Sequence, residues 1–244
     1  HDAFTIAKEE ILSVQAPEVR MTMPAAISMP LETRRNAVVR IQNLQIKYGE
    51  KTILRDFNWT INQGDRWALV GKNGAGKTTL FSMIFADHPM AYSQEIYLFG
   101  KRRGSGESIW DIKRRIGYLG PELISYLAPG SILLSGREYL RSINRKLNEK
   151  TLGELIQHFH AENFIDKPVR VLSSGQLQLM LIMNCFLTEK ELLLLDEPFQ
   201  FLDTRQRMLL KSYLEEHLHE DTTLILITHY EQDLADLTVH TMRI

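Results

Sequence analysis

The hydrophobic positions of the chain form short, nearly uninterrupted runs, separated by a long stretch with helical spacing. Runs that are apolar at successive positions predict strands covered on both faces, as in a parallel sheet. Such a run lies at residues 66–70, and further strands are expected at residues 95–99, 116–119, 192–195 and 223–227. Earlier in the chain, residues 38–41 and 44–48 predict paired strands, and residues 53–61 predict a further strand.

The stretch from residue 122 to about residue 167 has no strand-like run. Its apolar residues follow a helical spacing, first Tyr139, Ile143 and Leu147 and then Leu152 and Leu155. Strands, a helical insert and strands again predict an α/β fold, in which a mostly parallel sheet carries a helical subdomain.

Residues 1–36 differ from the rest of the chain because Pro17, Pro24 and Pro30 interrupt a stretch without helical or strand period. We expect a linker or N-terminal arm here, followed by one domain over residues 37–244. The chain begins at His1 rather than at Met, which suggests a piece of a longer protein.

Composition narrows the function classes only a little. The formal net charge of −1 implies no bulk attraction to nucleic acid or anionic lipid. Cys185 is the only cysteine, which excludes an internal disulfide, and we expect it in the core. No apolar run approaches the roughly 18 residues of a membrane span. The chain also has two basic clusters, at residues 101–103 and 113–115. Each is either solvated surface charge or a contact for phosphate or nucleic acid.

Residues 71–78, GKNGAGKT, match the phosphate-binding pattern G-x-x-x-x-G-K-[ST], with a strand-like run before them and a helix-forming run after them. Backbone N–H groups of such a turn and the helix N-terminus hold phosphate oxygens. We expect Lys77 to reach the β- and γ-phosphates of ATP and the Thr78 hydroxyl to bind Mg²⁺. The expected nucleotide-binding residues here are Gly71, Asn73, Gly74, Ala75, Gly76, Lys77, Thr78 and Thr79.

Two carboxylates follow the apolar run at residues 192–195 and complete the expected metal site. Ligands of open α/β sheets bind at the carboxyl ends of the strands. Asp196 is therefore expected to hold Mg²⁺, and Glu197 to orient or deprotonate the attacking water.

The segment LSSGQ at residues 172–176 resembles the LSGGQ signature of ABC ATPases, and the order of motifs agrees with that family from Val38 to the C-terminus. The resemblance implies a P-loop NTPase of ABC type, with an antiparallel β edge and an inserted helical subdomain. A Ser-Gly helix start offers a hydroxyl, N–H groups and a helix dipole to an anion. The resemblance implies that Ser173, Ser174, Gly175 and Gln176 contact the γ-phosphate bound by a second cassette.

The same resemblance assigns functional roles to other residues. Tyr48 is similar to the aromatic residue that stacks on adenine, and His229 to a histidine that contacts the γ-phosphate. Leu202 and Asp203 resemble a loop that runs along the interface between cassettes. The catalytic set that the resemblance implies is Glu197, His229 and Lys77.

The chain departs from the family pattern after residues 116–119. The family presents a glutamine to the metal and the water there, but this chain has Gly120, Pro121 and Glu122. Glu122 is expected to take over the metal contact. The missing glutamine puts nucleotide-coupled motion of the helical subdomain in doubt more than ATP binding.

The implied function is Mg²⁺-dependent ATP hydrolysis in a head-to-tail nucleotide-sandwich dimer, with the second cassette on the same parent chain or in a homodimer. Residues 100–112 and 116–123 are similar to tandem-cassette ATPases of molybdate transport or photorepair. We therefore expect the chain to energise transport, with a molybdate-like oxyanion as cargo, beside a membrane subunit at the cytoplasmic face. The alternatives are a soluble tandem ATPase acting on nucleic acid or ribosomes, and a low-turnover regulatory cassette.

Overall fold

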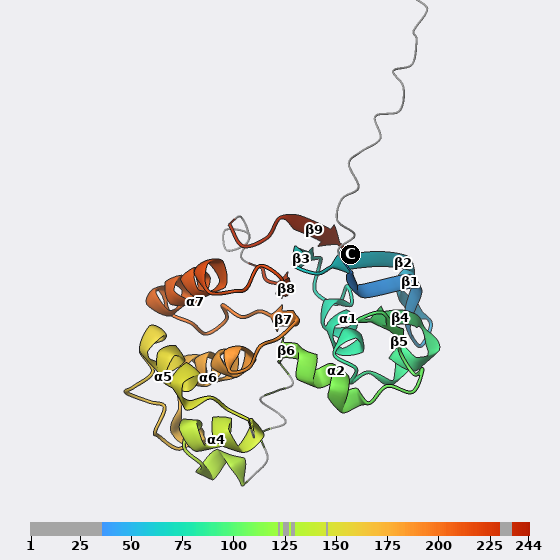
Figure 1. Cartoon of the computed structure of the whole chain (residues 1–244). Coiled ribbons are helices and arrows are strands. Elements are labelled where there is room, and N and C mark those ends of the chain that lie inside the picture. The colour runs from blue at the N-terminus through green and yellow to red at the C-terminus, as the bar shows by residue number, and fades with distance from the viewer. Residues whose placement is uncertain (1–35, 122, 124–126, 128–129, 145, 230–235) are drawn as a thin grey trace, which may run out of the picture. The chain divides into compact units, whose positions relative to one another are not determined.

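The computed structural model describes residues 36–121, 123, 127, 130–144, 146–229 and 236–244, which all belong to one compact unit (Figure 1). The arm expected over residues 1–36 lies outside the described residues except for its last residue, and so does Glu122. The strands are β1 (Ala37–Tyr48), β2 (Lys51–Asn62), β3 (Arg66–Val70), β4 (Glu95–Leu98), β5 (Lys101–Arg102), β6 (Ile116–Leu119), β7 (Leu192–Asp196), β8 (Thr223–Ile227) and β9 (His240–Arg243). The α-helices are α1 (Lys77–Ile84), α2 (Ile109–Arg115), α4 (Gly136–Ile143), α5 (Glu149–His158), α6 (Ser174–Phe186) and α7 (Thr204–Glu216).

A five-stranded sheet with the order β6-β7-β8-β3-β9 forms the centre, and all of its neighbouring strands are parallel. Every residue of β7 and β8 is buried. Leu193 and Leu195 face one hydrophobic core, whereas Leu192 and Leu194 face the other. The sheet is therefore covered on both faces, as its uninterrupted apolar runs predict.

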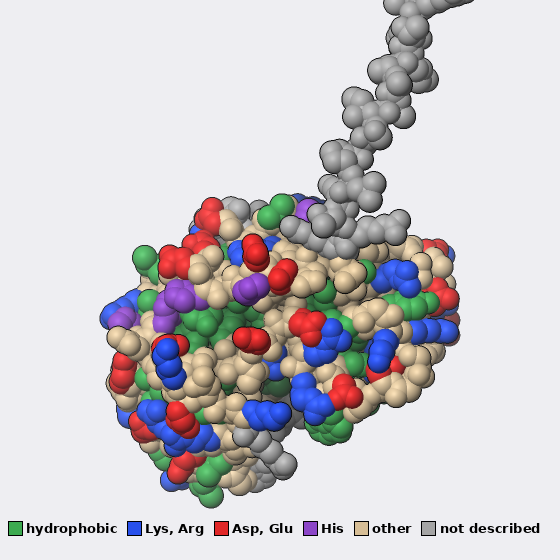
Figure 2. All heavy atoms as spheres, viewed as in Figure 1, with side chains coloured by type: hydrophobic (Ala, Val, Ile, Leu, Met, Phe, Trp, Pro, Cys, Tyr) green, Lys and Arg blue, Asp and Glu red, His purple; other side chains and the backbone are tan. Residues whose placement is uncertain are grey.

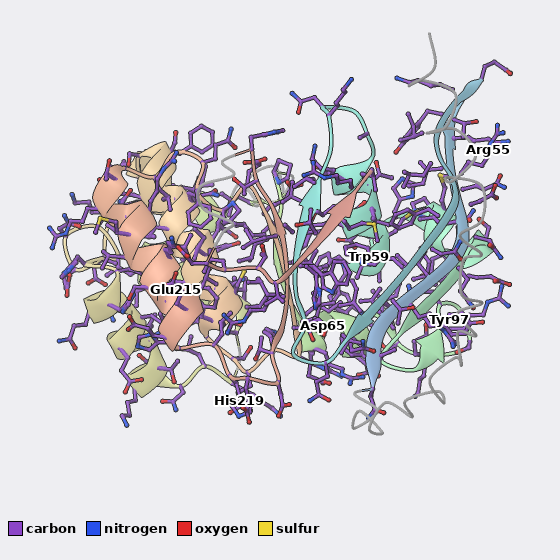
Figure 3. All side chains as sticks on the ribbon, turned by 90° about the horizontal axis from the view of Figure 1, so that it is seen from above. Arg55, Trp59, Asp65, Tyr97, Glu215 and His219 are labelled. Carbon is purple, nitrogen blue, oxygen red and sulfur yellow. The ribbon has the colours of Figure 1, made fainter. Side chains whose placement is uncertain are left out.

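One face of this sheet packs against α1 and a second sheet, which is antiparallel and has the order β2-β1-β4-β5. Trp59 of β2 meets Trp67 of β3 edge to face, with ring centroids 5.5 Å apart. In Figure 3, Trp59 lies between the sheets, while Arg55 and Tyr97 lie on the outer side. The α/β fold class is confirmed, and the antiparallel strands form a sheet of their own.

The prediction that residues 38–41 and 44–48 pair with each other is wrong. They form the single strand β1, and its antiparallel partners are β2 and β4. Asn43 has a left-handed φ of 47°, and the pairing register with β2 shifts at this point. The alternation of side chains between the two faces of β1 is interrupted there. This is a β-bulge, and its backbone N–H is bonded to the Asn58 side chain at 3.0 Å, so the strand continues past it.

The other face of the parallel sheet is covered by α4, α5, α6 and α7, which pack around a second core (Figure 1). The helices expected between residues 122 and 167 are present as α4 and α5. Cys185 of α6 is buried as expected, and its burial raises the pKa of the thiol to about 12. The thiol is therefore a core side chain rather than a nucleophile.

Three of these helices begin with the same capping arrangement. Ser173 caps α6 and is paired with Gln176, Ser135 caps α4 with Glu138, and Asp203 caps α7 with Gln206. In each, the cap side chain accepts from a backbone N–H of the first turn, and the later side chain accepts from the backbone N–H of the cap. The start of α6, which lies within the LSSGQ segment, is therefore fixed by its own side chains.

Acidic and basic side chains are interspersed on the face shown in Figure 2. Within the two basic clusters, Arg103 pairs with Glu107, Lys113 with Asp87, Arg114 with Asp111 and Arg115 with Glu191. These pairs favour structural and solvated charge over a phosphate-binding surface. No helix in the described part of the chain is both long and apolar enough to cross a membrane.

Replacing Gly117 with alanine is expected to destabilise the fold. The added Cβ would lie 2.5 Å from Leu193 Cδ2 and 3.1 Å from the Cys185 carbonyl oxygen, so the buried Leu193 side chain would have to repack and α6 would have to shift slightly away from β6. Overpacking of this kind costs about 1–3 kcal/mol. Urea unfolding measures the change. Gly153→Ala is the matched control, because that Cβ meets nothing within 4 Å inside α5 and should stabilise by about 0.5–1 kcal/mol. Equal unfolding midpoints for the two variants would contradict this packing.

Candidate active site

A pocket of about 680 Å³ lies where four parallel strands end. Loops that follow β3, β6, β7 and β8 meet there, which is the position at which open α/β sheets bind ligands. The lining includes Tyr48, Asn73, Gly74, Gly76, Lys77, Thr78, Thr79, Gly120, Pro121, Gln178, Asp196, Glu197, Gln200, Phe201 and His229. Most of the predicted site residues are therefore brought together.

The glycine-rich loop leads from β3 into α1 through a left-handed turn. Gly76, at the N-cap of α1, has a φ of 97°, and a Cβ on it would lie 2.9 Å from Ile53 Cγ2. Only glycine fits this position without strain. No side chain caps α1, and its first turn carries no acidic residue. Free N–H groups and the positive end of the helix dipole are thus offered to an anion.

Lys77 lies inside this loop, where it is 8% exposed. Its ammonium donates to the carbonyl oxygens of Gly71 at 2.7 Å and Lys72 at 3.1 Å. The loop itself therefore holds the cation in place beside the helix start. This arrangement places a positive charge where phosphate oxygens would bind.

Thr78 and Asp196 provide an oxygen pair at the floor of the pocket. The Thr78 hydroxyl donates to Asp196 Oδ2 at 2.7 Å, and Asp196 is buried at the end of β7. Mg²⁺ prefers oxygen ligands such as hydroxyl and carboxylate groups. The pair fits that ion, as the sequence predicts. Glu122, the third expected ligand, lies outside the described residues.

Glu197 follows directly and adopts a left-handed φ of 51°. Its Oε1 is 3.3 Å from His229 Nε2, and its Oε2 accepts from the His229 backbone N–H at 3.4 Å. Burial raises the pKa of Glu197, and His229 opposes that rise. A carboxylate with a raised pKa accepts a proton more readily from water. The pair Glu197 and His229 can therefore serve as a base beside the phosphate site.

Tyr48 stands at the rim of the pocket at the end of β1. Its ring is half exposed, and its hydroxyl shares a 3.1 Å hydrogen bond with Thr79 Oγ1 of α1. The antiparallel sheet thus presents an aromatic face beside the phosphate loop. This geometry is compatible with a stacked planar base.

The LSSGQ residues do not line this pocket. Ser173 and Gln176 cap α6, and Gly175 packs on the loop after β7, because a Cβ there would lie 2.6 Å from the Phe201 carbonyl oxygen. Ser173 and Ser174 are not buried. The start of α6 is therefore open to another molecule rather than to the pocket of its own chain.

Two lining residues, Gln178 and Phe201, are not singled out by the sequence. The Gln178 amide donates to the carbonyl oxygens of Glu197 at 3.2 Å and Pro198 at 3.5 Å. A buried glutamine inside the apolar run of α6 is a recognisable signal for such a contact. Phe201 follows an apolar pattern and gives no comparable signal.

Comparison with known proteins agrees with this geometry. Residues 54–200 match the model of the ABC transporter family. The chain is 35% identical to the ABC transporter ATP-binding protein ModF of Escherichia coli (95% of this chain, 48% of that protein). It is 34% identical to an uncharacterized ABC transporter ATP-binding protein of Schizosaccharomyces pombe (89% and 45%). The ergothioneine transport ATP-binding protein EgtV of Helicobacter pylori is 29% identical (85% and 97%).

The chain spans about half the length of the first two of these relatives. The family match covers the phosphate loop, the antiparallel sheet in part, the signature segment and both carboxylates. The chain therefore belongs to the ABC transporter family, as an ATP-binding cassette.

Proposed function

We propose that this cassette binds MgATP in the pocket described above and hydrolyses it as one half of a head-to-tail sandwich with a second cassette. The observation that supports the sandwich is the position of the signature segment. Ser173 to Gln176 form an open helix start that is absent from the lining of their own pocket. Such a helix start would complete the nucleotide-binding site of a second cassette.

In this mechanism the backbone of residues 71–78, the start of α1 and Lys77 bind the triphosphate. Thr78 and Asp196 would hold Mg²⁺, which supplies charge neutralisation to the phosphate oxygens when bound. Glu197 would hold the attacking water and accept its proton, and His229 keeps the Glu197 carboxylate in place while facing the γ-phosphate. Tyr48 would stack on the adenine. Catalysis would arise mainly from positioning and charge stabilisation.

We propose transport as the use of this hydrolysis, with a membrane subunit as partner at the cytoplasmic face. The name of the Helicobacter pylori relative and the family match support transport in general. A molybdate-like oxyanion is the cargo class suggested by the sequence resemblance alone. Arg103 of the first basic cluster and all three residues of the second are ion-paired, which disfavours action on nucleic acid.

A mixing experiment tests the sandwich. Lys77→Ala removes the phosphate-binding charge of one chain, whereas Ser174→Glu adds a carboxylate to the signature helix without harming it, since an acidic residue in a first turn is favourable. Each variant alone should lose ATP hydrolysis. Mixed together, they should regain part of it, because one site then combines an intact phosphate loop with an intact signature from the other chain.

Phosphate release measured over a series of mixing ratios is the readout, with a maximum expected near equal amounts. A mixture no more active than either variant alone would contradict a head-to-tail homodimer of this chain. Thermal unfolding of each variant is the control for folding.

A further inference from the structure

The outer face of the antiparallel sheet, turned away from the core, carries a row of polar side chains. Arg40 of β1 lies opposite Thr60 of β2 and opposite Tyr97 of β4. Tyr97 in turn lies opposite Arg102 of β5. Directly opposite residues of neighbouring strands project to the same face of a sheet. Arg40, Thr60 and Arg102 are exposed, and Tyr97 lies on the outer side in Figure 3, so the four side chains form one row on the solvent side.

Two more cations extend this face along the strands. Ile46 and Leu54 lie opposite each other and are both buried. Because successive side chains of a strand alternate between its faces, Lys47 and Arg55, which follow them, point outward. Both are exposed, and Figure 3 shows Arg55 on the same side of the sheet as Tyr97. We define the outer sheet face by its four cations, Arg40, Lys47, Arg55 and Arg102.

These four cations are not neutralised within the described part of the chain. None of them forms an ion pair with another described residue, unlike Arg103 and the three residues of the second basic cluster. The four strands contain six lysine or arginine residues and only two acidic residues, Asp56 and Glu95. The formal net charge of the whole chain is −1, so the face is a local excess of positive charge. Such a surface is complementary to a partner of negative charge.

The contact between Arg40 and Tyr97 indicates the chemistry of that partner. The Arg40 guanidinium lies over the Tyr97 ring, 4.2 Å from its centroid. A stacked guanidinium keeps its edge N–H groups free, and their planar fork matches the two oxygens of a carboxylate. The same contact covers a face of the aromatic ring that a nucleic-acid base would need for stacking. A chain with a net charge of −1 also has no long-range field that attracts a polyanion, so a short acidic peptide segment fits this face better than nucleic acid.

We propose that the outer sheet face binds an acidic, extended segment of a partner protein. The four cations lie on β1, β2 and β5, so a segment that crosses the sheet contacts all of them through its carboxylates. None of the four lines the nucleotide pocket. Docking at this face therefore goes beyond the ATP hydrolysis proposed above, and it requires neither a bound nucleotide nor a second cassette.

The test measures binding of a fluorescent peptide to the full chain by fluorescence anisotropy. The probe is a synthetic peptide that alternates Glu and Thr, and the matched control peptide alternates Gln and Thr. At an ionic strength of about 0.15 M the acidic peptide should bind saturably, and the neutral peptide should not. Added salt should weaken the binding, because exposed charges are screened.

Substitutions on the face identify the binding site. Arg40→Gln combined with Arg102→Gln should weaken binding of the acidic peptide about tenfold or more, because two charge-assisted contacts are lost. The matched control is Lys167→Gln combined with Arg170→Gln. It removes two exposed cations outside the sheet that form no ion pair with a described residue, and it should leave the affinity unchanged.

Thermal unfolding of both double variants is the control for folding. If the first double variant is destabilised, Lys47→Gln combined with Arg55→Gln replaces it, because these residues do not contact the Tyr97 ring. The same weakening of peptide binding is expected for that pair.

The outcomes that overturn the proposal are distinct. The acidic peptide may fail to saturate, the two peptides may bind equally, or both sets of substitutions may weaken binding to the same extent. A single-stranded oligonucleotide or an anionic lipid vesicle that binds the face more tightly than the peptide, and is released by the same substitutions, would identify a different class of partner. Self-association of the chain in sedimentation that these substitutions abolish would identify a second copy as the occupant.

Discussion

Glu197→Gln is expected to lower the rate of ATP hydrolysis by about 10²–10⁴-fold, the range by which a positioned general base accelerates proton transfer. Glutamine keeps the shape of the side chain but cannot accept a proton from water. The contact with the His229 backbone N–H can persist, because the glutamine oxygen still accepts a hydrogen bond. ATP affinity should therefore remain close to that of the parent.

Single-turnover measurement of phosphate release separates this chemical step from nucleotide binding. Glu189→Gln is a suitable control, since that glutamate is exposed and does not line the nucleotide pocket. If Glu197→Gln hydrolyses ATP as fast as the parent, Glu197 is not the base. A slow parent enzyme whose turnover the substitution does not change would instead support the low-turnover regulatory alternative.

Lys77→Ala is expected to weaken ATP binding by about 100-fold or more. The substitution removes a buried cation and its charge-assisted hydrogen bonds to phosphate, which contribute about 1.5–3 kcal/mol each. It also removes the two bonds from the ammonium to the Gly71 and Lys72 carbonyl oxygens, so the loop loses its internal tether. Isothermal titration calorimetry with ATP measures the affinity.

The control for charge is Lys101→Ala, which removes an exposed lysine of β5 away from the pocket. Thermal unfolding shows whether either variant is destabilised. An affinity for ATP that is unchanged in Lys77→Ala would mean that the nucleotide binds elsewhere on the chain.

That the residues of the proposed phosphate site lie together could be predicted from the sequence, because they are contiguous or follow recognisable strands. Gly76, Lys77 and Thr78 belong to one short motif, and Asp196 ends an apolar run. Each places its side chain at the same sheet edge through the topology of parallel strands. The sequence analysis expects Thr78 and Asp196 at one metal site, and in the structure their side chains share a hydrogen bond.

Features that depend on tertiary contacts could not be predicted. The bulge at Asn43 is held by the Asn58 side chain of the neighbouring strand. The sequence pattern breaks at the bulge, and we therefore predicted two strands where the structure has one. In α4 the helical spacing rested on Tyr139 and Ile143 and predicted a helix without showing which residue is buried. Leu140 is the buried residue of that helix, and Ile143 is exposed.

The left-handed conformation of Phe201 is a further example. The Phe201 carbonyl oxygen lies 2.6 Å from the place that a Cβ on Gly175, a residue distant in sequence, would take. Local patterns at residues 198–202 contain no glycine and therefore give no sign of a positive φ. The strained turn becomes visible only when α6 and the end of β7 are placed together.

The measurement that tests the account most directly is a calorimetric titration of the chain with ATP, performed with Mg²⁺ and again with the metal chelated. We expect saturable binding that is tighter with Mg²⁺, and a loss of that difference in Asp196→Asn. Absence of saturable binding in the presence of Mg²⁺, or identical affinity with and without the metal, would contradict a nucleotide seated between the phosphate loop and Asp196.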